Sequence, residues 1–459
     1  MDTQDLKPQT YQRVFYAARQ AIRRHVSGGN ILIISTLLAL VIANIPAINQ
    51  YYFSFWEQEV RLQIGSFNLF SHGGHPMSLL SFINDALMAV FFFTIGLEIK
   101  REILVGQLAS FRNALLPIVA AIGGMLLPVC IFMFMSGNTP YSGGAAIPMA
   151  TDIAFSLGVL AMLGSRVPLS LKIFLTTLAV VDDIGGILVI AIGYTAHVEL
   201  WYLIGAAIIL GILCIGQHIR IKSKIFYLTL GGVVWFLFLN SGVHPTIAGV
   251  LVAFCIPAKP VFNPKGYIKT IRRAIGNFRA ENDEALTRYS ILSGQQMDWL
   301  KQIESASDKV ISPLQELEDS LHPIVNYLIV PLFAFANAGI YLLDMPPASA
   351  FQGVSLAIII SLVMGKFLGI LGFSWLAVKL RLAPMPDHAT WPMISGVALL
   401  GGIGFTVSLF IANLTFNPAD EMQSQLLNMS KLGIVIGSLT AGILGYLALK
   451  LTTRPAARL

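Results

Sequence analysis

Charged residues are scarce in this chain of 459 residues. Asp, Glu, Lys and Arg make up only 12% of the sequence, against about 25% in ordinary soluble domains, and the mean hydropathy is +0.72. This shortage excludes a water-soluble fold and predicts a polytopic membrane protein that contacts membrane lipid. The net charge of +6 is explained better by basic cytoplasmic loops than by nucleic-acid binding, so we expect no nucleic-acid partner.

Cysteine is scarce as well. Cys130, Cys214 and Cys255 lie in apolar segments without the spacing of metal ligands, which predicts that they are packing residues. The first apolar run starts near Ile31 and merges into a full span, so we expect no cleavable signal peptide.

Long apolar runs, in contrast, are abundant. They lie at roughly 29–46, 79–99, 115–135, 143–163, 169–194, 200–216, 225–239, 243–256, 321–343, 354–378, 391–413 and 426–449. Since a bilayer span takes about 20 residues, the runs predict an all-α protein with about 12 transmembrane helices, several of them short. Basic residues gather in alternate connections, and the positive-inside rule then places both termini in the cytoplasm.

The segments outside the spans divide the chain further. Residues 1–27 are basic with apolar residues at helical spacing, which predicts a cytoplasmic amphipathic segment or simply a basic tail. Residues 28–257 would hold spans one to eight, 258–320 a cytoplasmic linker, 321–450 spans nine to twelve, and 451–459 a cytoplasmic tail. Alternating apolar residues around Gly65 and Ser66 predict a small β-hairpin near 60–69 on the outer surface, the alternative being a plain surface loop.

Two adjacent carboxylates, Asp182 and Asp183, stand in the middle of the apolar run 169–194. A carboxylate at the bilayer centre costs about 2.5–3.5 kcal/mol on insertion scales, so such residues are functional-site candidates by default. Thr151 and Asp152 follow a helix-breaking proline in the fourth span, and Lys366 lies at the middle of the tenth. We expect the partners of the two carboxylates among these residues.

The fourth and eleventh spans are both interrupted, the fourth by Pro148 and the eleventh by glycines 401, 402 and 404. The two spans are seven apart and therefore cross the membrane in opposite directions, and each is the middle member of a triplet, spans 3–5 and 10–12. This pattern predicts an inverted repeat whose two broken helices cross at the membrane midplane. Asp152 and Lys366 would offset the partial charges at the half-helix ends.

Neighbouring residues on a helix point about 100° apart, so Asp182 and Asp183 face different directions. One of them can pair with Lys366 while the other faces a water-filled cavity. Hard carboxylate and hydroxyl oxygens suit a small hard cation rather than a soft metal. The pattern therefore predicts a site for protons or for one monovalent cation, with a purely structural ion pair as the alternative.

Over nearly its whole length the sequence resembles the NhaA-type sodium/proton antiporters of bacterial inner membranes. The motifs that carry the resemblance are 96–102 (GLEIKRE), 150–155 (ATDIAF), 163–168 (LGSRVP), 182–183 (DD), 241–244 (SGVH), 331–339 (PLFAFANAG), 365–366 (GK) and 402–406 (GIGFT). Members of this family are themselves examples of the inverted-repeat architecture. The resemblance implies a secondary transporter, not an enzyme, that exchanges cytoplasmic Na⁺ or Li⁺ for external protons in a pH-regulated manner and without a cofactor.

The resemblance also implies roles for individual residues. Asp182 and Asp183 would carry Na⁺ and protons, with Thr151 and Asp152 beside them and Lys366 as the partner of Asp182. The positions linked to the pH response are Glu98, Arg101, Glu102, His244, Glu318 and His322. Family members form homodimers through an outer-surface β-hairpin, which fits residues 60–69. If one sodium ion displaces two protons, net positive charge enters in each cycle and the exchange is electrogenic; the second proton would come from Asp182 or from Lys366.

Two other classes of protein also place carboxylates in a membrane. An intramembrane aspartyl protease needs one Asp on each of two facing helices to share a proton; Asp182 and Asp183 on one helix fit this badly, whereas Asp152 with Asp183 stays open on the sequence alone. An ion channel is the other class, but broken helices at a midplane site favour alternating access.

Overall fold

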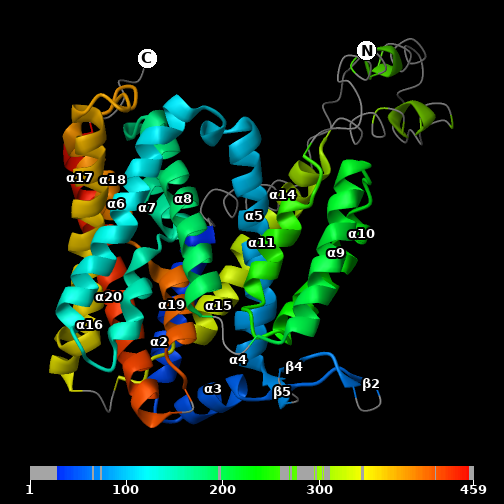
Figure 1. Cartoon of the computed structure of the whole chain (residues 1–459). Coiled ribbons are helices and arrows are strands. Elements are labelled where there is room, and N and C mark those ends of the chain that lie inside the picture. Colours follow the sequence, from blue (N-terminus) through cyan, green and yellow to red (C-terminus); the bar gives the residue numbers. More distant parts are fainter. Residues whose placement is uncertain are drawn as a thin grey trace, which may run out of the picture.

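Long helices dominate the structure, and a few short strands lie at one end (Figure 1). This computed structural model describes residues 28–453 except 65–66, 73–74, 195–197, most of 259–310, 343–345 and 419. The expected N-terminal segment 1–27, most of the expected linker and the tail from residue 454 lie outside the described residues.

The helices form two groups that stand side by side (Figure 1). The first, which we call the core bundle, consists of α6 (Phe111–Ser136), η3 (Ser142–Met149), α7 (Ile153–Met162), α8 (Leu169–Gly193), α16 (Gly353–Ile360), η7 (Ser361–Gly365), α17 (Lys366–Lys379), α18 (Trp391–Leu400), α19 (Phe405–Thr415) and α20 (Glu421–Thr452). The second, the lateral group, consists of α2 (Gly28–Ala43), α4 (Leu79–Phe82), η1 (Ile83–Leu87), α5 (Met88–Val105), α9 (Leu200–His218), α10 (Lys224–Leu239), α11 (Thr246–Phe254), α14 (Pro313–Ile324), η5 (Val325–Ile329) and α15 (Val330–Asn337). Short helical elements in the connections are α3 (Asn49–Trp56), η2 (Gln107–Ala109), η4 (Gly164–Arg166) and η6 (Pro347–Phe351).

Many of these helices can cross a membrane. In the described part of the chain, seven helices are long and apolar enough to do so, and two bent helix pairs raise the number to nine. α2 and α10 are shorter apolar helices. The bent pairs are η3 with α7 and α18 with α19, each bent by 42°. The breaks expected in the fourth and eleventh spans are therefore confirmed. The count of seven to nine candidate spans in the described residues is below the expected twelve, and the expected inverted repeat stays a prediction.

The two breaks touch each other. Pro148 lies in the last turn of η3, where a missing N–H prevents a regular helix from continuing, and the backbone of Asp152 is extended, with ψ of 103°. At the other break, a Cβ on Gly402 would lie 2.5 Å from the carbonyl oxygen of Leu362, so only glycine fits there. The Asp152 N–H donates to the Ile403 carbonyl at 2.7 Å, which joins the two breaks directly.

Lys366 enters the core bundle where α17 and η7 lie against α6 with their backbones in contact. A Cβ on Gly369 would lie 2.2 Å from the carbonyl oxygen of Gly123, and a Cβ on Gly365 would lie 2.7 Å from the Cα of Pro128. Larger side chains at either position would push the helices apart. Because Lys366 lies between these two contacts in the sequence, the close packing fixes where its side chain starts.

The expected hairpin near 60–69 is present. β2 (Gln63–Ile64) and β3 (Phe67–Asn68) pair in antiparallel fashion with Ile64 opposite Phe67, and the turn between them lies outside the described residues. A second sheet has the strand order β1-β5-β4, formed by β1 (Glu59–Val60), β5 (His75–Ser78) and β4 (Ser71–His72).

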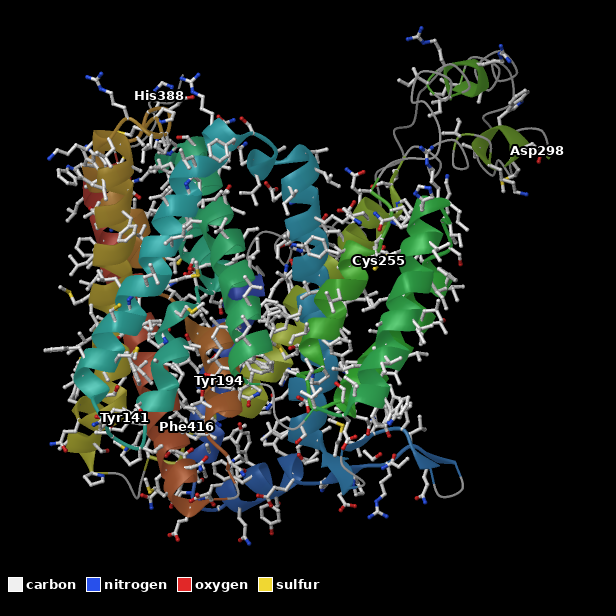
Figure 2. The ribbon with its side chains drawn as sticks, viewed as in Figure 1. Tyr141, Tyr194, Cys255, Asp298, His388 and Phe416 are labelled. Carbon is white, nitrogen blue, oxygen red and sulfur yellow. The ribbon has the colours of Figure 1, made fainter. Side chains whose placement is uncertain are left out.

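The molecule has two distinct ends. The strands lie at the end that we call the strand end, whereas the end of α17 and the loop with His388 lie at the opposite end (Figures 1 and 2). Two contacts lie at this second end: the Ser170 hydroxyl in the first turn of α8 donates to the Asp387 carbonyl at 2.5 Å, and Lys224 at the start of α10 pairs with Glu316 of α14. We call it the basic end, because the sequence gathers its basic loops there.

Candidate functional site

Lys366 and Asp182 form a completely buried pair at the centre of the core bundle. The Lys366 ammonium donates to Oδ2 of Asp182 and, at 3.0 Å, to the hydroxyl of Thr151. The Thr151 oxygen lies 2.6 Å from the same Oδ2 and 2.8 Å from the carbonyl oxygen of Gly401. Since a hydroxyl carries one hydrogen, Thr151 donates to one of these two acceptors at a time. Three elements, α17, α8 and the break after η3, thus meet at one carboxylate oxygen.

The second oxygen of Asp182 is different. Its Oδ1 is buried without a hydrogen-bond partner among the described residues. Buried polar atoms are nearly always paired, because leaving one unpaired loses the solvation of that atom with nothing in exchange. Oδ1 is therefore the oxygen of Asp182 that no group in the described part of the protein satisfies.

Asp183 points in another direction, as helix geometry predicted. Its side chain lines a cavity of about 290 Å³, and Asp182 is not part of that lining. Thr151 and Asp152 line the same cavity, and so do Glu98 and His322 of the lateral group. The His322 side chain is 53% exposed. The cavity thus lies between the two helix groups and leads from the basic end to Asp183.

Asp152 caps two half-helices at once. Its Oδ1 accepts from the N–H of Phe155 at 2.9 Å in the first turn of α7, and its Oδ2 accepts from the N–H and the hydroxyl of Thr406 at 3.1 and 2.6 Å in the first turn of α19. A carboxylate in this position offsets the partial positive charge of both helix N-termini, as the sequence predicted for Asp152. Lys366 instead contacts Asp182 and Thr151. The carbonyl end of α18 accepts from the hydroxyls of Thr151 and Ser156, at Gly401 and Leu400.

The same hydrogen bonds bear on the protease alternative. Two catalytic aspartates must lie close enough to share one proton. Both oxygens of Asp152 accept from helix N-termini, and none of its hydrogen bonds within the described part of the chain reaches Asp183, so the shared-proton pair of such a protease is not seen.

Five of the six residues linked to the pH response lie together where α5 meets α14. Arg101 Nη1 lies 2.5 Å from Oε1 of Glu318, and Arg101 Nη2 lies 3.4 Å from Oε1 of Glu102. His322 Nε2 lies 3.5 Å from Oε1 of Glu98. Because Glu98 and His322 also line the cavity, this network stands at the cavity mouth, and we call it the mouth network.

His244 lies apart from the mouth network. It precedes α11, where its Nδ1 is 2.8 Å from the hydroxyl of Thr246 and its Nε2 is 3.6 Å from Oδ1 of Asp85. Its ring packs edge-on against Phe410 of α19, with centroids 5.3 Å apart. The structure therefore places this residue at the strand-end side of the site, between the lateral group and the core bundle.

Several polar residues that no sequence pattern singled out come together in the structure. Asp85 stands in the apolar run 79–99, which is the same signal that identified Asp182. Three asparagines, Asn84, Asn337 and Asn413, also meet at this side. Asn337 lies in the motif 331–339, but nothing in the sequence shows that the three amides are neighbours, because they come from three distant segments.

This fold and this site define a class of protein. Two bent helix pairs touch at their breaks, a buried lysine and buried carboxylates lie at the junction, and a cavity reaches them from one end. Broken helices around a buried ionic site are the architecture of secondary transporters.

Comparison with known proteins agrees with this class. The family model described as Na⁺/H⁺ antiporter 1 matches residues 19–449. A protein of Phocaeicola vulgatus named Na⁺/H⁺ antiporter NhaA is 54% identical over 435 residues, which cover 95% of this chain and 96% of that protein. A protein of the same name from Bacteroides fragilis is 54% identical over 426 residues (93% and 95%), and Na⁺/H⁺ antiporter NhaA 1 of Saccharophagus degradans is 42% identical over 443 residues (95% and 92%). The chain belongs to the Na⁺/H⁺ antiporter 1 family, which confirms the resemblance seen in the sequence.

Proposed function

We propose that this chain exchanges Na⁺ or Li⁺ for protons at Asp182 and Asp183. The observation that carries the proposal is the unpartnered, buried Oδ1 of Asp182, next in sequence to a carboxylate that lines the cavity. Together with the Thr151 hydroxyl these oxygens are hard ligands that suit a small monovalent cation. The same carboxylates hold protons when no cation is bound, so the two cargoes compete for one site.

The geometry supports an order of events. A cation that enters through the cavity meets Asp183 first, because Asp182 is held by Lys366 and Thr151. To bind both carboxylates the cation must compete with the Lys366 ammonium. One proton then leaves Asp183, and a second leaves either Asp182 or Lys366, since the ammonium loses its attraction to Asp182.

Counting charge makes this exchange electrogenic. Two protons enter for each sodium ion that leaves, so one net positive charge moves inward in each cycle. An elementary charge gains about 2.3 kcal/mol per 100 mV of membrane potential. The potential would therefore drive sodium out even where the proton gradient is small.

The mouth network supports a pH-regulated exchange. It joins α5 to α14 through ion pairs of Arg101 and of His322, so a change in its ionisation changes the contacts between the elements that line the entry of the cavity. His244 would respond separately, through its contact with Asp85.

The setting that we propose is a bacterial inner membrane. About 12 transmembrane helices, with spans 3–5 and 10–12 as inverted repeats, would leave the basic end and both termini in the cytoplasm, as the loop charges indicate. The strand end would then face outward, and the β2–β3 hairpin would join two copies as a homodimer. Lipid and the transported cations are the expected partners, with no cofactor.

Everted membrane vesicles test this function. With a pH gradient established, Na⁺ or Li⁺ added outside should dissipate the gradient, whereas choline should not. Asp183→Asn should abolish the response, because Asn keeps the shape but neither loses a proton nor supplies an anionic ligand. The matched control is Asp387→Asn in the exposed loop before α18, which should respond like wild type. A wild-type protein that leaves the gradient intact, or a fully active Asp183→Asn, would refute the proposal.

A further inference from the structure

Three asparagines link the two helix groups on the side away from the cavity. Asn337 is completely buried at the end of α15; its Nδ2 donates to Oδ1 of Asn84 at 2.8 Å, and its Oδ1 accepts from Nδ2 of Asn413 at 2.8 Å. Backbone carbonyls fix the amide orientations, because Asn337 also donates to Phe333 at 3.0 Å and Asn413 to Leu409 at 2.9 Å. The three amides therefore form one ordered chain of hydrogen bonds.

This chain crosses a boundary within the fold. Asn413 belongs to α19 of the core bundle, whereas Asn337 and Asn84 belong to α15 and η1 of the lateral group. α15 and α19 lie side by side in the middle of the molecule, above the strand end (Figure 1). The bond between Asn413 and Asn337 thus ties the bundle that carries the ion site to the helices beside it.

Residues of α19 show where the amides lie relative to the site. Thr406, Phe410 and Asn413 follow one another at spacings of four and three, so they lie on one face of the helix. Thr406 lines the cavity, and Asn413 lies about 10 Å further along α19, at a rise of about 1.5 Å per residue. The amide chain is therefore on the opposite side of the site from the cavity mouth.

Phe410 fills the space between. It is completely buried, and its ring packs against Phe92, Phe333 and His244 of the lateral group, with centroids 5.5, 6.4 and 5.3 Å apart. An aromatic layer and a row of amides thus close the strand-end side, while the cavity leaves the other side accessible.

We propose that Asn84, Asn337 and Asn413 form an amide latch that holds the strand-end side of the site closed and must break for the cation to leave there. The proposal rests on the proposed exchange, because a carrier opens its site to one side at a time. Contacts between the two groups on the closed side must then separate in every cycle. One neutral hydrogen bond changes a conformational equilibrium constant by about two- to tenfold. This is enough to favour the closed conformation, and the bond is weak enough to break in every transport cycle. The amides do not titrate, so this bias is independent of pH.

The first test is the side dependence of sodium affinity. Asn413→Ala removes the bond between the groups, so the outward-open fraction should rise, and the apparent KM on each side varies inversely with the fraction open to that side. In right-side-out vesicles the KM for Na⁺ should fall about two- to tenfold, while in everted vesicles it should rise no more than about twofold. Asn240→Ala is the matched control: its amide donates to Phe236 of its own helix at 3.0 Å, and both KM values should stay unchanged. If the KM for Na⁺ changes equally in both kinds of vesicle, or in neither, the amides only stabilise the fold and the latch proposal is refuted.

A second test does not depend on the stability of the alanine variant. In a protein with Cys130, Cys214 and Cys255 replaced by Ala, a short cleavable thiol cross-linker joins Asn337→Cys to Asn413→Cys. Linking should stop exchange, and reductive cleavage should restore it.

The control link lies within the core bundle, between Tyr194→Cys and Thr415→Cys, whose native hydroxyls lie 2.9 Å apart. This linked protein should stay active. The latch proposal is refuted if the Asn337→Cys/Asn413→Cys protein transports Na⁺ as fast when cross-linked as it does after cleavage of the cross-linker. Wild-type protein in the same vesicles distinguishes failure of the latch proposal from failure of the proposed function. If wild type exchanges Na⁺ for protons, only the latch proposal is refuted; if it does not, the proposed function is refuted.

Discussion

Replacing Lys366 by Met should strongly destabilise the protein. Lys366 and Asp182 are both 0% exposed, and Met retains most of the apolar stem while removing the charge. Asp182 would then keep Thr151 as its neighbour and lose the only cation among its hydrogen-bond partners in the described residues. Breaking a buried ion pair by removing one partner costs about 3–5 kcal/mol.

The double variant shows whether the cost comes from the pair. When Lys366→Met is combined with Asp182→Asn, no uncompensated charge stays buried, and replacing both partners of such a pair is often nearly neutral. We therefore expect the double variant to be more stable than Lys366→Met alone. The double variant should not transport Na⁺, because it lacks the Asp182 carboxylate, so stability and activity separate.

Thermal unfolding of the purified proteins in detergent is the assay. Lys366→Met should lower Tm by several degrees, and the double variant should recover most of that loss. Lys379→Met is the matched control on the same helix, because that lysine is exposed and packs over the Trp375 ring at 4.2 Å, a contact worth only about 0.5–1 kcal/mol. A Lys366→Met protein as stable as wild type, or a double variant no better than Lys366→Met, would refute the reasoning.

Three further predictions concern the hairpin, the second proton carrier and Tyr52. Deleting residues 60–69 should weaken dimerisation without changing transport per protomer, because the β2–β3 pair lies at the strand end, away from the cavity mouth; an unchanged dimer fraction in detergent cross-linking would exclude this role. On a supported membrane, wild type should carry current during exchange, and a Lys366→Ala protein that still transports but carries none would identify Lys366 as the second proton carrier. Burial raises the pKa of Tyr52 from 10.0 to about 12, so the folded protein keeps a proton that the unfolded chain releases, and stability is lost as the pH rises from about 10 to 12. Tyr52→Phe should remove that loss, which amounts to about 1.4 kcal/mol by pH 11, seen as a smaller drop in Tm between pH 9 and pH 11 than in wild type.

Much of the site could be predicted because charged residues are so rare in the apolar runs. Asp182, Asp183 and Lys366 stand out by composition alone, and helix geometry was enough to show that the two carboxylates face different ways. The breaks could be predicted too, because Pro148 and the glycines near 402 interrupt or weaken a regular helix.

Pairings between distant segments could not be predicted. That Asp152 caps both α7 and α19 depends on how the two breaks meet, and no local pattern encodes that arrangement. The same holds for Asn413 with Asn337, whose bond depends on the packing of the core bundle against the lateral group. The sheet of β1, β5 and β4 was not predicted either, because β1 pairs with β5 across the whole hairpin, with Glu59 opposite Ser78.

The most direct test of the account is whether Na⁺ displaces protons from this one site. Purified protein in weakly buffered detergent solution, with a pH-sensitive dye, should release protons when NaCl is added and none when choline chloride is added. Asp183→Asn should release markedly fewer protons than wild type, and Asp387→Asn should release as many as wild type. Proton release from Asp183→Asn equal to that of wild type would contradict the claim that Na⁺ and protons compete for Asp182 and Asp183.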